Sequence, residues 1–111
     1  MRVVVDNTKG GEAQFASNLQ ESLDAAGFDV DVREPSVDAM YGTAVHFVVE
    51  AVSVRVPEDI GRGELKVVAA AVRDAEARRS SERHRVRAVP IYRGETSRVM
   101  GWVDVFASDL I

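Results

Sequence analysis

The first residues that could do chemistry form the loop 6–11, "DNTKGG". The loop follows the apolar run 3–5 and precedes a segment with helical spacing, so backbone amides at the helix start would attract an anion. The candidate anion ligands are Thr8, Lys9, Gly10 and Gly11. The loop contains neither GxGxxG nor GxxxxGK[ST], and a carboxylate at Asp6 would repel an anion. A tight turn that needs its two glycines for backbone conformation is the plainer interpretation.

A second candidate site lies in the basic segment 78–98. This segment contains seven arginines and two glutamates, whereas the whole chain has a net charge of −4. Its arginines alternate along a predicted strand and would align with others across a hairpin, next to two aromatic side chains of the kind that interfaces favour. The predicted interaction surface consists of Arg85, Arg87, Tyr92, Arg93, Arg98 and Trp102. The alternative is a solvated strand face that balances the acidic remainder of the chain.

No constellation of residues points to catalysis or to a metal. The chain has no cysteine, which excludes thiol chemistry and thiolate zinc sites. Its two histidines, His46 and His84, are not spaced with acids as metal ligands. Ser53, His46 and Asp6 can be combined into a triad on paper, but no GxSxG motif marks a nucleophile. We therefore expect no catalytic residue, no metal ligand and no cofactor.

The elements that position these residues begin with a β-α-β unit. Residues 2–6 form a short β-branched run that predicts a buried strand. Apolar residues then recur at three- and four-residue steps over 12–26, which predicts a helix that ends at Gly27. Residues 28–34 alternate apolar and charged side chains, which predicts a second strand, parallel to the first through a right-handed crossover.

The rest of the chain predicts one ambiguous element, one helix and a hairpin. Residues 43–56 fit either a strand or a buried helix, and their many valines favour the strand. Residues 63–79 predict a second helix, and 85–92 with 98–106 a hairpin in which Pro90 requires an unpaired side or a bulge. The order β-α-β-(β or α)-α-β-β predicts a single α+β domain over residues 1–111. We expect this domain to be a two-layer sandwich, and the order of the elements favours a ferredoxin-like variant with one extra strand.

Residues 3–34 resemble the opening of a flavodoxin, with a strand, a phosphate loop, a helix and the strand "AAGFDVDV". The resemblance implies that loop 6–12 binds phosphate or flavin. Flavodoxin loops typically read T-x-T-G-N-T, whereas this chain has Asn7, Thr8, Lys9 and Gly10 there. A small-molecule-binding domain of flavodoxin-like descent is thus the alternative function.

A longer part of the chain is similar to small bacterial domains of the effector-associated constant component type. The similarity rests on "MYGTA" at 40–44, on an alanine-rich helix ending in Arg78 and Arg79, and on "VPIYRGE" at 89–95. The chain departs from those domains at Val72 and Arg73, where they often have a tryptophan. The resemblance implies an adaptor that acts beside an effector.

Composition narrows the class of partner. The acidic net charge disfavours a general nucleic-acid binder. The first residues lack the pattern of a signal peptide, and the longest apolar stretch is too short to cross a bilayer. We therefore expect a cytoplasmic, non-enzymatic interaction or adaptor module. Its expected partner is a protein, either another chain or a second copy in a homodimer, and neither nucleic acid nor membrane.

Overall fold

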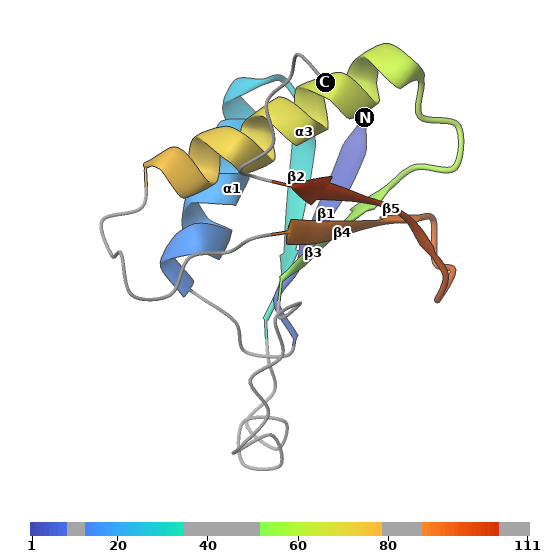
Figure 1. Cartoon of the computed structure of the whole chain (residues 1–111), viewed down its shortest axis with the longest axis horizontal. Helices are drawn as coiled ribbons and strands as arrows, with labels where there is room; N and C mark the ends of the chain where they lie inside the picture. Colours follow the sequence, from blue (N-terminus) through green and yellow to red (C-terminus); the bar gives the residue numbers. More distant parts are fainter. Residues whose placement is uncertain (9–12, 35–51, 79–87, 105–111) are drawn as a thin grey trace.

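The computed structural model describes residues 1–8, 13–34, 52–78 and 88–104. These segments form one mixed sheet of five strands, with two helices side by side on one face of it (Figure 1). The elements are β1 (Arg2–Asp6), α1 (Ala13–Ala25), β2 (Asp29–Arg33), β3 (Ser53–Val56), α3 (Arg62–Ala77), β4 (Ala88–Arg93) and β5 (Val99–Asp104). The predicted α+β class and two-layer arrangement are confirmed. Neither of the helices in these segments is long and apolar enough to cross a membrane.

The strand order is β2-β1-β3-β4-β5. β1 and β2 are parallel neighbours, as the β-α-β prediction requires, and β3 and β4 form a second parallel pair joined through α3. A ferredoxin-like sheet would insert another strand between β1 and β2, but β3 pairs antiparallel with the other side of β1. The prediction of a ferredoxin-like variant is therefore wrong. β2 alternates valines with Asp29, Asp31 and Arg33, and such charges suit an edge strand better than an inner one.

Helix α1 ends as its sequence predicts. Gly27 has a φ of 97°, a left-handed conformation that glycine adopts without strain. The Phe28 amide donates to the Leu23 carbonyl (3.1 Å) and the Gly27 amide to the Asp24 carbonyl (3.0 Å), which is the pattern of a Schellman motif. Phe28 is thereby brought into the core, and β2 starts directly after it.

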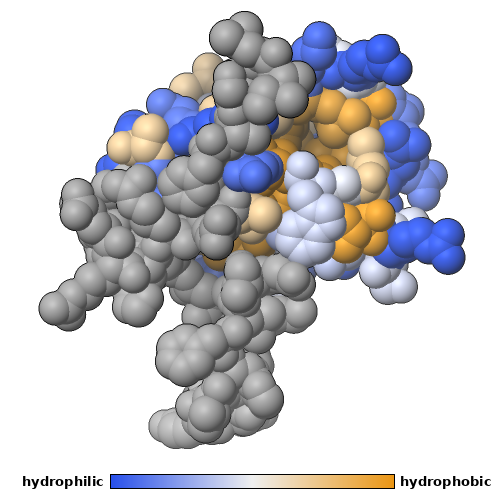
Figure 2. Space-filling view, in the orientation of Figure 1, coloured by the Kyte–Doolittle hydropathy of each residue, from blue (hydrophilic) through white to orange (hydrophobic). Residues whose placement is uncertain are grey.

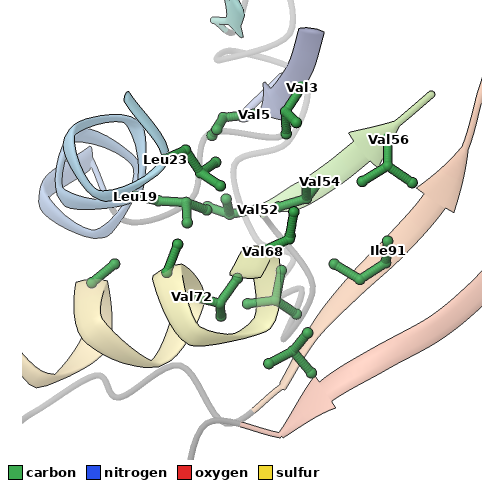
Figure 3. Packing of buried hydrophobic residues seen from close by; sticks show 14 of the residues in the cluster. Val3, Val5, Leu19, Leu23, Val52, Val54, Val56, Val68, Val72 and Ile91 are labelled. Atoms are coloured by element: carbon green, nitrogen blue, oxygen red, sulfur yellow. The ribbon is translucent and has the colours of Figure 1, made fainter. Parts of the chain in front are cut away.

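The core lies between the sheet and the two helices (Figure 3). Alternate residues of the inner strands point to the helices, and Val3, Val5 and Val54 have no exposed surface. The helices contribute Leu19, Leu23, Val68 and Val72. Burying each such side chain contributes about 1.5–3 kcal/mol, so this contact between the layers is the main stabilising feature. The ambiguous segment is a strand over Ser53–Val56, and residues 43–51 lie outside the described residues.

β4 and β5 form the predicted hairpin, which accommodates Pro90. The Gly94 amide donates to the Val56 carbonyl of β3 (2.7 Å). Every second residue of a strand directs its backbone groups to the same neighbouring strand, so the backbone nitrogen of Pro90 also faces β3. The pairing of β3 with β4 starts only at Ile91. Pro90, which has no amide hydrogen to donate, therefore lies just before the hydrogen-bonded part of the two strands. A register shift between Ile91 and Tyr92 adds a bulge in the pairing with β5.

Polar contacts around Arg78 join the two helices. Nη2 of Arg78 donates to the Ser22 hydroxyl (2.6 Å) and to the Asn18 carbonyl (2.7 Å) of α1. Its Nε lies 3.1 Å from the Asp74 carboxylate, and its Nη1 lies 3.1 Å from the Glu21 carboxylate. The Ser22 hydroxyl in turn donates to Asp74 (2.7 Å). Charges and hydroxyls at this helix contact are thus paired with one another.

Candidate interaction surface

One face of the sheet carries no helix in the described part of the chain. Val3, Val5 and Val54 point to the helices (Figure 3), so the residues that alternate with them point to the opposite side, which we call the open face. The strand register aligns the side chains of this face across the sheet. One row is Asp31, Val4, Arg55, Tyr92 and Val99. Beside it, Arg33, Asp6 and Ser53 are aligned over β2, β1 and β3, and Pro90 is paired with Trp102 over β4 and β5.

Arg55 lies at the centre of the open face, and its side chain is only 18% exposed. The guanidinium lies 4.8 Å from the centre of the Tyr92 ring, a distance at which a cation–π interaction is favourable. Its Nε lies 3.9 Å from the Asp6 carboxylate. Its Nη1 donates to the carbonyls of Gly94 (3.1 Å) and Thr96 (2.8 Å). These carbonyls belong to residues 94–98, the β4–β5 turn, so a side chain of β3 binds the turn that follows β4.

The charged part of the open face lies over β2, β1 and β3. Nη2 of Arg33 donates to the Glu95 carboxylate at 3.0 Å. This hydrogen bond raises the pKa of Arg33 above its ordinary value. Asp6 is the register partner of Arg33 and also approaches Arg55. Positive and negative groups thus alternate across this part of the face.

The apolar part of the surface lies over β4 and β5. Trp102 is 50% exposed and Met100 is 36% exposed, and Tyr92 is half-buried beside Arg55. Figure 2 shows hydrophobic surface around the place where β4 and β5 lie in Figure 1, bordered by hydrophilic groups. Exposed tryptophan, tyrosine and methionine are enriched at protein interfaces. We call Tyr92, Met100 and Trp102 the apolar patch.

The structure separates the residues of the predicted interaction surface. Tyr92 and Trp102 both lie on the open face. Arg93 alternates with Tyr92 and therefore points to the other side of the sheet, at the exposed end of β4. Arg98 is exposed and directly precedes β5. Arg85 and Arg87 lie outside the described residues. The aromatic side chains therefore share a face that Arg93 does not.

Sequence reasoning missed Arg55 and Met100. The signal for Arg55 was its place in "VSVRVP", where it is the one charged side chain of a valine-rich strand. A charge in such a strand requires polar partners. Those partners lie 39 and 41 positions later in the chain, which a local pattern does not reveal.

The loop at the end of β1 gives little support to anion binding. The amide and the hydroxyl of Thr8 both donate to one Asp6 carboxylate oxygen, at 3.0 and 2.7 Å, which forms an Asx-type turn. Lys9, Gly10 and Gly11 lie outside the described residues. A pocket of about 160 Å³ beside the start of α1 is lined in part by Gln20 and Glu34. It is smaller than the roughly 300 Å³ at which ligand sites begin, and Glu34 would repel a phosphate.

Across the described ranges, no three histidine, aspartate or glutamate side chains are grouped so as to hold a metal ion. His46 and His84 lie outside those ranges. No protein-family model, curated protein or solved structure matches this chain. The resemblances to flavodoxins and to effector-associated domains therefore stay predictions.

Proposed function

We propose that this chain is a non-enzymatic protein-interaction module that associates with a second copy of itself through the open face. The observation that carries the proposal is Trp102, which is half exposed on an edge strand and points to a face that no described helix covers. Burying a large aromatic side chain is a strong driving force for association. The apolar patch is the anchor of this contact.

The charges of the open face support a second copy as the partner. A two-fold contact sets one surface against itself, so the surface must carry both signs of charge. The face offers acids at Asp6, Asp31 and Glu95 and bases at Arg33 and Arg55. Such a face can meet its own copy without a net repulsion.

The two edges of the sheet favour contact through the face rather than strand addition. The β2 edge alternates Asp29, Asp31 and Arg33 with valines, and the β5 edge contains the bulge opposite Ile91 and Tyr92. Charges and bulges are two devices by which sheets avoid edge-to-edge pairing. An adaptor role beside an effector, in the cytoplasm of a bacterium, belongs to the same proposal and is supported by the resemblance of the sequence.

Sedimentation equilibrium over a wide concentration range tests the proposal. We expect dimers of the wild-type protein and at least about a tenfold weaker association for Trp102→Ala, because anchor residues carry most of the energy of an interface. Val67→Ala is the matched control, since Val67 is 41% exposed on α3 and lies off the open face. Equal association of all three proteins, or a wild-type protein that stays monomeric, would contradict the proposal.

A further inference from the structure

Arg55 is an unusual residue for the centre of a sheet. Its direct neighbours in the same row, Val4 and Tyr92, are uncharged. Its Nε is shielded from solvent and donates no hydrogen bond to any of the described residues. Removing a guanidinium from water costs free energy unless other contacts compensate. The compensation at this site comes from the Tyr92 ring, from Asp6 and above all from the β4–β5 turn.

The β4–β5 turn has few other attachments. Residues 95–98 are all exposed, so apolar burial does not hold them. The ion pair of Arg33 with Glu95 also reaches the turn, but its two side chains are 37% and 77% exposed, and such exposed pairs contribute little. Arg55 adds two hydrogen bonds to the turn, a part-buried one to Gly94 and an exposed one to Thr96. Together with the backbone hydrogen bond from the Gly94 amide to Val56, they tether the turn to β3.

The turn leads directly into the residues of the apolar patch. Val99 follows Arg98 and pairs with Tyr92, and Met100 lies in the bulge that comes next. We propose that Arg55 is a positioning residue, which holds the β4–β5 turn so that Met100 and Trp102 are presented in one geometry for association. This inference rests on the proposed function. Because coupling between two processes is reciprocal, association at the patch must also stabilise the turn.

Arg55→Lys separates the tether from the charge. Lysine keeps a positive charge near Asp6 and Tyr92, but its ammonium sits one bond closer to the backbone than Nη1 of arginine, the atom that donates to both carbonyls. The lysine side chain is therefore too short to replace both hydrogen bonds. Arg93→Lys is the matched control, because it makes the same chemical change in the same hairpin at an exposed residue that the open face does not include. Both variants retain the net charge of the protein.

Amide hydrogen exchange at Gly94 measures the tether directly, because this amide donates to Val56 (2.7 Å) at the start of the turn. The exchange rate is compared with that of the Val5 amide in the inner strand β1, which reports a general loss of stability. We expect the ratio to rise about tenfold in Arg55→Lys and to stay unchanged in Arg93→Lys. In the wild-type protein, raising the concentration should slow Gly94 exchange.

Sedimentation equilibrium of the same variants tests the consequence for association. Arg55→Lys should associate about tenfold more weakly than the wild-type protein, and Arg93→Lys should associate equally well. An unchanged Gly94 ratio, or wild-type association in Arg55→Lys, would overturn the positioning role. A wild-type protein that stays monomeric would overturn the proposed function. The Gly94 ratio would then still show whether Arg55 holds the β4–β5 turn.

Discussion

Removing the Arg78 side chain tests whether polar contacts hold α1 and α3 together. The Arg78→Ala variant loses two hydrogen bonds to α1, to Ser22 and Asn18, and two ion pairs, with Glu21 and Asp74. Arg78 is 40% exposed, so water replaces part of the hydrogen bonding, and the two hydrogen bonds together contribute roughly 1 kcal/mol. The acids are 64% and 57% exposed, and such ion pairs contribute about 0.5 kcal/mol each.

The expected loss of unfolding free energy is therefore about 2 kcal/mol, which for a domain of this size lowers Tm by roughly 8 °C. Urea titration followed by circular dichroism measures it. Arg78→Lys should lose about half as much, because lysine keeps the charge without the fork. Arg93→Ala is the control, since Arg93 is exposed and forms no ion pair within the described residues, and it should change stability by no more than about 0.5 kcal/mol.

High salt provides a second check on the same reasoning, because salt screens the two exposed ion pairs and leaves the hydrogen bonds to neutral groups. The cost of Arg78→Ala should then fall to about 1 kcal/mol. If Arg78→Ala proves no more destabilising than Arg93→Ala, the contacts around Arg78 do not stabilise the packing of α1 against α3.

Two glycines are expected to respond oppositely to alanine. Gly94 has a φ of 60°, and an added Cβ would lie 2.9 Å from the Glu58 side chain, so Gly94→Ala should cost about 1–2 kcal/mol in a urea titration. No change would show that the turn does not hold this left-handed conformation. Gly63 lies in the first turn of α3 with nothing within 4 Å of an added Cβ, so Gly63→Ala should stabilise by about 0.5 kcal/mol. A measured loss for Gly63→Ala would mean that α3 does not begin as described.

Local patterns in the sequence predicted the elements well. The spacing of Phe15, Leu19 and Leu23 predicted α1, and all three side chains have no exposed surface. Gly27 was correctly predicted as the end of that helix. The hairpin was also expected and is confirmed by the pairing of β4 with β5. The unpaired side expected at Pro90 faces β3, where the ladder starts only at Ile91. These features depend on neighbours within one turn or one hairpin, and the sequence displays such neighbours directly.

Features that depend on distant partners could not be predicted in the same way. Whether β3 lies between β1 and β2 or on the other side of β1 depends on long-range pairing, which periodicity does not encode. The tether from Arg55 to Gly94 joins two elements that are far apart in the sequence. Strand alternation separates Tyr92 from Arg93. The predicted interaction surface grouped residues by charge and by closeness in the sequence, and it therefore joined side chains that point to opposite sides of the sheet.

The fluorescence of Trp102 tests the central claim most directly, because it is the single tryptophan of the chain and is half exposed on the proposed contact surface. A tryptophan that moves from water into an interface emits at a shorter wavelength. We expect the emission maximum to shift to shorter wavelength as the wild-type protein is concentrated, and to return on dilution. The control Val67→Ala should show the same shift. An emission maximum that stays constant from dilute to concentrated protein would contradict association through Trp102.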